Sequence, residues 1–89
     1  MRENVEHYVY ILKSLIADKY YIGRTTDPDR RLFFHNTTEK GFTARYRPWK
    51  QVWLHKCTSN EDAIRLEKKI KSWKSKKMIE RLIIGDVEI

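Results

Sequence analysis

The sequence has little of what stabilises or divides many small proteins: one cysteine, two prolines and three glycines in 89 residues. Cys57 has no partner within the chain, which excludes an internal disulfide and agrees with a reducing compartment. The three histidines are scattered and match no Cys/His zinc spacing, so the pattern argues against a structural zinc site. Because no repeat, low-complexity tract or Gly/Ser linker interrupts the chain, we expect one domain over residues 1–89.

Long hydrophobic runs are also missing. The longest apolar run, over residues 9–12, is far too short to cross a bilayer. The N-terminal segment lacks the hydrophobic stretch that a signal peptide needs. We therefore expect a cytoplasmic protein that does not enter the membrane.

Acidic residues are too few to balance the basic ones. Lys and Arg total 19 against 12 Asp and Glu, which gives a net charge of +7. Such an excess favours nucleic acid or another anionic surface as a partner, without choosing between them. Since 40% of the residues are apolar and 12% are aromatic, the chain can still bury a core.

Three segments have the alternating pattern of strands. Residues 6–13 alternate between two faces, which predicts a half-buried strand. One face carries Tyr8, Tyr10 and Leu12, and the other carries Val9 and Ile11. After a polar turn, residues 20–23 return as the second strand of a hairpin, and residues 51–57 form a third strand. Gly23 at a strand end indicates a bulge or the close approach of another backbone or a ligand.

Two regions have helical patterns, separated by a basic loop over residues 37–48. Asp27-Pro28-Asp29 is a strong helix start, and this helix runs through His35. A longer helix begins at residues 58–60 and carries an apolar stripe at spacings of three and four. The stripe consists of Ala63, Leu66, Ile70 and Trp73. Ser75 marks either a kink or a new helix start, and apolar positions between 78 and 83 form a final buried face.

Glu67 lies in the longest predicted helix, at roughly 40° from Ala63 on the helical wheel. A carboxylate at this angle lies at the edge of the core-facing arc. One interpretation is an exposed-edge glutamate paired with a lysine such as Lys71. The other is a partly buried carboxylate that holds a metal ion. The spacing alone leaves both open.

Arg31 and His35 share one helix face because they are four residues apart. They form either a solvated basic face or a phosphate clamp with a nearby proton-transfer group. Tyr10 and Tyr21 either pack in the core or direct their phenol oxygens to one site. A free phenol is ionised in only about one molecule in a thousand at neutral pH. A catalytic tyrosine therefore needs cations, such as Arg24, Arg31 or a metal, to favour the phenolate.

The tryptophans and lysines also allow two interpretations: a structural one, in the core or on a solvated face, and binding to nucleic acid. Trp49, Trp53 and Trp73 could stack on nucleobases, but the apolar pattern favours the core for Trp53 and Trp73. Between residues 65 and 81 there are eight basic and two acidic residues. These lysines spread around the helix as a solvated face that can still attract a polyanion.

The order of these motifs resembles the GIY-YIG endonuclease superfamily. Tyr8-Val9-Tyr10 and, after a turn, Tyr21-Ile22-Gly23 resemble its paired motif. The similarity covers residues 7–83 and continues through further positions in family order: Arg24, Asp27, Arg31, His35, Pro48-Trp49, Leu66-Glu67 and Ile70 to Ser75. It is closest to the small stand-alone bacterial members that resemble the N-terminal domain of the UvrC repair nuclease.

The resemblance implies an α+β fold, in which helices flank a small three-stranded antiparallel sheet. It also implies a DNA endonuclease that uses one Mg²⁺ or Mn²⁺ ion, with a possible place in DNA repair or recombination. Arg31 then stabilises the transition state, Glu67 binds the metal, and His35 matches a histidine of several branches. Tyr10 and Tyr21 are jointly assigned as the general base. The residues expected to contact DNA are Arg24, Arg45, Lys71 and Lys74.

Two departures from the family pattern affect these expectations. The first motif has Tyr8 where the family name has Gly, and no Asn follows Glu67. Larger members also carry separate DNA-reading domains, for which this sequence offers no candidate. We therefore expect weak or unselective cleavage, or a protein partner that supplies specificity. The alternatives are a nucleic-acid-binding or partner-docking module with little cleavage activity, and an RNA-binding surface.

Overall fold

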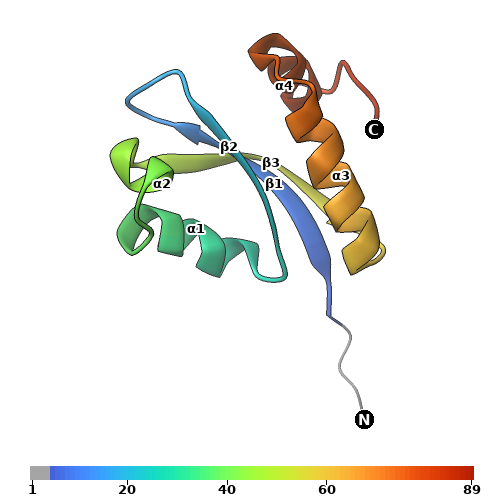
Figure 1. The fold of residues 1–89 in the computed structure, drawn as a ribbon, viewed down its shortest axis with the longest axis horizontal. Coiled ribbons are helices and arrows are strands. Elements are labelled where there is room, and N and C mark those ends of the chain that lie inside the picture. Colours follow the sequence, from blue (N-terminus) through green and yellow to red (C-terminus); the bar gives the residue numbers. More distant parts are fainter. Residues whose placement is uncertain (1–4) are drawn as a thin grey trace.

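The structure is a computed structural model that describes residues 5–89 and contains three strands and four helices. Residues 1–4 lie outside the described residues. They belong to the N-terminal segment for which no signal peptide was predicted. The elements in chain order (Figure 1) are β1 His7–Ser14, β2 Tyr20–Thr25, α1 Pro28–Thr37, α2 Phe42–Arg45, β3 Trp49–Cys57, α3 Asn60–Ser72 and α4 Lys76–Ile83. No helix within residues 5–89 is both long and apolar enough to cross a membrane.

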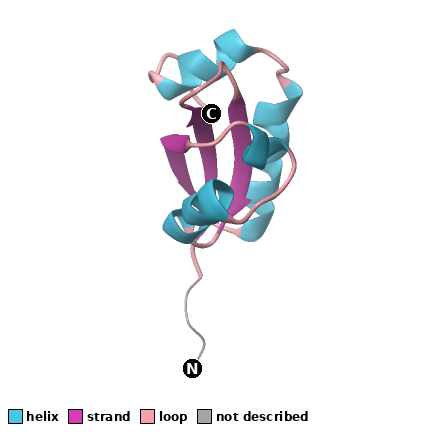
Figure 2. Ribbon diagram, turned by 90° about the vertical axis from the view of Figure 1, so that its left-hand side faces the viewer, coloured by secondary structure: helices cyan, strands magenta, loops and turns pink. Residues whose placement is uncertain are grey.

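The strands form one antiparallel sheet in the order β2-β1-β3, so β1 is central and β2 is an edge. The α+β fold predicted from the sequence is confirmed, with helices around a three-stranded sheet (Figure 2). β1 and β2 pair in continuous register, which places Tyr10 opposite Gly23. The register irregularity lies instead between β1 and β3, at Ile11/Leu12, so the bulge considered at Gly23 is absent from this pair.

Helices cover both faces of the sheet (Figure 1). Val9 and Ile11 of β1 are fully buried against residues of α3 and α4, such as Ile70. Tyr10 and Leu12, which point the other way, pack in a second cluster that includes Leu32 and Tyr46, beside α1 and α2. The alternation predicted for β1 is therefore confirmed, and each face has its own core.

Each long helix begins at a polar capping residue. The Asp27 side chain accepts a hydrogen bond from the Arg30 amide at 3.2 Å, and Pro28 occupies the first turn. Ser59 caps α3 in the same way. Ser75 accepts from the amide of Met78, so the sequence signal at Ser75 is a new helix start rather than a kink.

Some predicted boundaries were wrong. The region expected to be a basic loop contains the one-turn helix α2, and β3 begins two residues earlier than predicted. The tryptophan with the lowest exposure is Trp49, at 3%, whereas Trp53 and Trp73 are partly buried and pack against the core. The early start explains this, because it gives Trp49 a place in the sheet beside Leu12.

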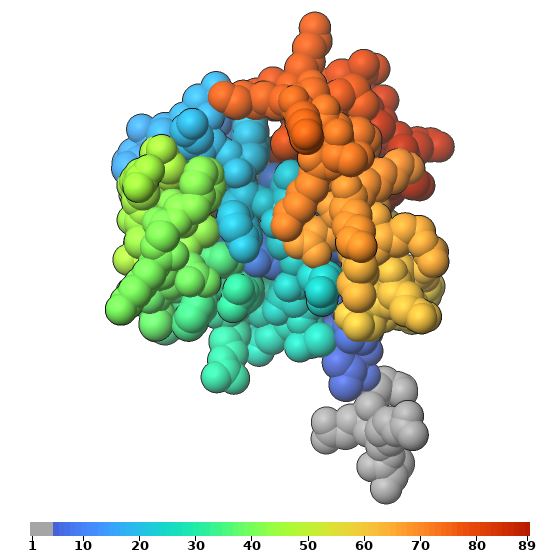
Figure 3. Space-filling view, in the orientation of Figure 1, coloured from blue at the N-terminus to red at the C-terminus, as the bar shows by residue number. Residues whose placement is uncertain are grey.

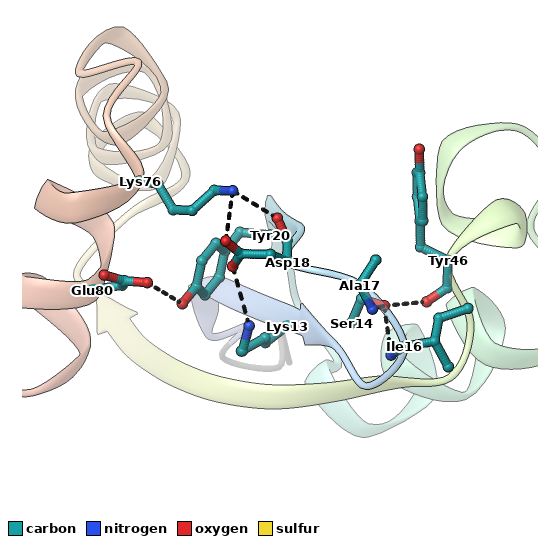
Figure 4. A network of polar contacts seen from close by, with 9 residues as sticks. All are labelled: Lys13, Ser14, Ile16, Ala17, Asp18, Tyr20, Tyr46, Lys76 and Glu80. Carbon is teal, nitrogen blue, oxygen red and sulfur yellow. Dashed lines mark hydrogen bonds and ion pairs between the residues drawn. The ribbon is translucent and has the colours of Figure 1, made fainter.

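The turn of the β1–β2 hairpin is held from two sides (Figure 4). The Lys76 ammonium of α4 contacts the Asp18 backbone oxygen at 2.8 Å and its carboxylate at 2.9 Å. On the other side, the Ser14 hydroxyl donates to the Tyr46 carbonyl at 2.8 Å. These contacts tie the hairpin turn and the end of β1 to elements on both faces of the sheet.

Candidate active site

Tyr10 reaches the edge of the sheet because its partner on β2 is a glycine. A Cβ at Gly23 would lie only 2.6 Å from the Tyr10 Cζ, so the phenol ring occupies the space above that position. The close approach at Gly23, which was expected of another backbone or a ligand, is made instead by the Tyr10 side chain. Tyr21 lies on the same face of β2, and its ring centroid is 6.3 Å from that of Tyr10.

His35 of α1 lies behind Tyr10 and has no exposed surface. Its Nε2 is 2.9 Å from the Tyr10 hydroxyl oxygen, and its Nδ1 has no hydrogen-bond partner among residues 5–89. Burial lowers the pKa of the His35 imidazole below its ordinary value of 6.5, and the positive charge of Arg31 adds to this shift. The imidazole is therefore mainly neutral at neutral pH.

Arg31 lies one helical turn before His35 and borders the same phenol. Burial raises the pKa of Tyr10 to about 12, although the nearby Arg31 guanidinium acts in the opposite direction. Tyr10 is therefore a protonated phenol at neutral pH. Arg31 also lies 3.8 Å from the Glu39 carboxylate. The face that Arg31 and His35 were predicted to share is directed at Tyr10.

Glu67 of α3 is held by two cations. Its Oε1 lies 3.0 Å from the Arg24 Nε, and its Oε2 lies 2.8 Å from the Lys71 Nζ. Only 16% of the Glu67 side chain is exposed. Each interpretation of the sequence pattern is correct in one respect. The carboxylate is paired with Lys71, as the first predicted, and it is largely buried, as the second predicted. The contact with Arg24 was not predicted.

The site lies across the β2 edge and draws on both faces of the sheet. Tyr21 and Gly23 face the α1 side, whereas Arg24 alternates to the α3 side, where it meets Glu67. The residues on the α1 side and those on the α3 side border one open cavity of about 270 Å³. Its lining residues are Tyr10, Tyr21, Gly23, Arg24, Arg31 and Glu67. Figure 3 shows this face hollowed between the cyan and green residues of β2 and α1 and the orange residues of α3.

Two residues that position the site were not predicted from the sequence. The Asn36 side chain accepts from the Trp49 amide at 2.6 Å and donates to the Trp49 carbonyl at 3.1 Å. The Arg47 Nε donates to the His35 carbonyl at 2.7 Å, which satisfies one of the last carbonyls of α1. Together these bonds fix the end of α1 that carries His35. A lone Asn and Arg in a basic segment give no local signal for such contacts.

The four residues predicted to contact DNA separate into two pairs. Arg24 and Lys71 lie within the site, in contact with Glu67. Arg45 is exposed on α2, and Lys74 is exposed in the turn between α3 and α4. Neither Arg45 nor Lys74 lines the cavity, so the structure does not bring this second pair to the other site residues.

A metal ion at this site would have one protein carboxylate as its ligand. Within residues 5–89 no three His, Cys, Asp or Glu side chains are grouped so that they could hold a metal. Glu67 nevertheless offers hard oxygen ligands, and its two oxygens already attract cations, since the charged groups of Arg24 and Lys71 lie beside them. Mg²⁺ commonly takes one or two carboxylates and completes its shell with water and phosphate oxygens. The donor set therefore fits a metal that shares its shell with DNA.

Comparisons with known proteins identify the family and support the fold. Residues 6–80 match the family described as the GIY-YIG catalytic domain. A UPF0213 protein of Bacillus pumilus is 34% identical over 77 residues, which cover 84% of this chain and 76% of the relative. The solution NMR structure of a UPF0213 protein of Bacillus halodurans superimposes with a TM-score of 0.56 at 32% identity. That similarity covers 88% of this chain and 82% of the other.

Proposed function

Because the chain belongs to the GIY-YIG family, we propose that it is a metal-dependent endonuclease that hydrolyses DNA phosphodiester bonds at the β2 edge. One observation carries the proposal: the cavity at this edge is lined by four of the five side chains expected to be catalytic. They are Tyr10, Tyr21, Arg31 and Glu67. The fifth, His35, is hydrogen-bonded to Tyr10 from behind.

Arg31 binds the reacting phosphate and balances the negative charge that develops on it. Its planar guanidinium presents paired donors that match phosphate oxygens. It lines the open cavity beside Tyr10, and its partner Glu39 is at the relatively long distance of 3.8 Å. Donors that are already in place for the developing charge cost little reorganisation during the reaction.

Tyr10 or Tyr21 accepts the proton of the attacking water. Tyr10 is protonated in the free protein, so it must first lose its own proton. The neutral His35 Nε2, at 2.9 Å, is placed to take that proton, and the cationic Arg31 favours the resulting phenolate. Tyr21 lines the cavity as well and remains the second candidate.

Glu67 holds the divalent ion, with Mg²⁺ or Mn²⁺ as the candidates. When bound, such an ion supplies charge stabilisation for the scissile phosphate and the leaving oxygen. The rest of the protein's contribution is to hold the phosphate against Arg31 and to keep the tyrosines beside it.

Branched and nicked DNA, the forms that arise in repair and recombination, are the first substrates to examine.

A cleavage panel with matched controls tests the proposal. Linear, nicked and branched DNA are incubated with Mg²⁺ or Mn²⁺ and with wild-type protein, Glu67→Ala or Arg31→Ala. We expect each variant to reduce the cleavage rate by about 100-fold or more, as loss of a transition-state contact does. Arg30→Ala and Glu61→Ala remove an exposed residue of the same kind from the same helix, and both should cut like wild type.

The second candidate is a nucleic-acid-binding or partner-docking module that cleaves little. One observation favours it: both oxygens of Glu67 already have cationic partners, as in a purely structural ion cluster. If wild type and both site variants bind DNA equally and all cut equally little, this function replaces the endonuclease. Competition between duplex DNA and single-stranded RNA at fixed salt identifies which nucleic acid is preferred. A protein partner that supplies specificity would raise cleavage when it is added.

A further inference from the structure

We infer that Arg24 and Lys71 couple metal binding at Glu67 to DNA binding. In the free protein the two cations hold the carboxylate. When DNA phosphates bind the two cations instead, Glu67 becomes available to the metal. The inference rests on the proposed function in one respect, because it takes Glu67 as the metal ligand.

Neither oxygen of Glu67 is left without a partner. Oε1 has the Arg24 guanidinium at 3.0 Å, and Oε2 has the Lys71 ammonium at 2.8 Å. A metal ion binds a carboxylate oxygen at about 2.0–2.1 Å, so it would lie within a few ångströms of at least one of these cations. The repulsion between them opposes metal binding for as long as the cations stay in place.

The cations are freer to move than the carboxylate. The Glu67 side chain is 16% exposed, whereas those of Arg24 and Lys71 are 43% and 53% exposed. Both cationic groups end long flexible stems that already extend into solvent. A rearrangement at this site therefore moves Arg24 and Lys71 away and leaves Glu67 where it is.

The phosphates of DNA supply new anionic partners for the displaced cations. Arg24 lines the same cavity as Arg31, where the proposed function puts a phosphate. Phosphate oxygens are ligands for both guanidinium and ammonium groups. The cluster of one carboxylate and two cations becomes strongly positive when a divalent ion joins it, and the phosphates remove this excess. Metal and DNA should therefore each strengthen the binding of the other by the same factor.

The test measures metal binding directly, by paramagnetic broadening of protein amide signals in NMR spectra as Mn²⁺ is added. The readout is the Mn²⁺ concentration that halves the intensity of the amides beside Glu67. Lys71→Met removes one of the two cations, and Lys68→Met makes the same charge change at an exposed lysine of the same helix. The spectra also report whether each variant is folded.

In free protein, we expect Lys71→Met to lower the Mn²⁺ concentration required by about 10-fold, within the usual range of coupling between two sites. Lys68→Met should leave that concentration close to the wild-type value. A 12-bp duplex should lower the concentration by a similar factor for the intact cluster, and by much less for Lys71→Met. The DNA arm uses a background with both Tyr10→Phe and Tyr21→Phe to keep the duplex uncut, and Glu67→Gln measures broadening by ions bound to DNA alone.

Three results overturn the inference, and failure of the coupling can be told apart from failure of the metal site. If Lys71→Met and Lys68→Met require the same Mn²⁺ concentration while Glu67→Gln abolishes broadening, the metal site stands and the coupling falls. The same holds if DNA leaves the required concentration unchanged. If Glu67→Gln broadens like wild type, the metal does not bind at Glu67, and the metal site of the proposed function falls with the inference.

Discussion

At position 23 the absence of a side chain gives the Tyr10 phenol its place over the β2 edge. In Gly23→Ala the new Cβ would lie 2.6 Å from the Tyr10 Cζ, and Tyr10, which is 2% exposed, has little room to move. We expect Gly23→Ala to lower the free energy of unfolding by about 1–3 kcal/mol, as overpacking does. Displacement of the phenol should also reduce cleavage by about 100-fold. Urea unfolding and the cleavage assay measure the two effects.

Gly41→Ala is the control for this substitution. Nothing lies within 4 Å of a Cβ at Gly41, but the φ of +84° there strains any other residue. We expect it to cost about 1–3 kcal/mol of stability and to leave cleavage unchanged. If Gly23→Ala lost stability but kept full activity, the position of the Tyr10 phenol would not matter for the reaction.

His35 should make the stability of the fold depend on pH. Burial lowers the pKa of its imidazole in the folded state, so between that lowered pKa and 6.5 the unfolded chain binds more protons. The contribution of His35 is therefore complete above pH 6.5 and is lost as the pH falls below it. The slope can reach at most about 1.4 kcal/mol per pH unit for one proton.

Urea unfolding of wild type and His35→Gln between about pH 7.5 and pH 5.5 isolates this effect, since carboxylates titrate mainly below that range. We expect stability to fall with pH in wild type, and to fall less steeply in His35→Gln. His7 and His55 are present in both proteins, so the difference between the slopes belongs to His35. Parallel slopes would mean that the buried imidazole takes up a proton without cost.

At the scale of elements, the sequence predicts whatever depends on neighbours along the chain. The alternation in β1 predicted a half-buried strand, and the polar residues at Asp27 and at 58–60 predicted two helix starts. Ser75 left a kink and a new helix start open, and the structure shows the new start. The short helix α2 has no side-chain cap and spans only four residues, so it left no periodic pattern to detect. Element boundaries with no such signal could not be found from the sequence.

The candidate site was predictable by residue but not by arrangement. The resemblance identified Tyr10, Tyr21, Arg31, His35 and Glu67, and the structure brings them to one edge. The Arg24–Glu67 ion pair joins β2 to α3, which are far apart in the sequence, and local spacing cannot show which helix covers which part of a strand. The bonds between Asn36 and Trp49 depend on the same tertiary information.

At the scale of the whole molecule, the net charge of +7 separates into charges that are paired and charges that are free to attract DNA. Arg24 and Lys71 are engaged by Glu67, whereas Arg45 and Lys74 are exposed outside the cavity. Their elements lie on either side of the hollowed face in Figure 3. Contacts with phosphates at such positions increase affinity without reading sequence.

Fluorescence anisotropy with a labelled duplex, at about 50 to 200 mM salt and without divalent metal so that the duplex stays uncut, tests this division of charge. Arg45→Gln and Lys74→Gln should each weaken binding to all duplexes alike and reduce the slope of log K against log salt by about 1. Lys69→Gln makes the same charge change at an exposed lysine of α3 that lies beside residues of β3, the opposite edge of the sheet, and should leave the slope unchanged. If all three variants shift the slope equally, net charge alone determines DNA binding. If only Arg45→Gln and Lys74→Gln do so, DNA lies along the face that leads to the β2 edge.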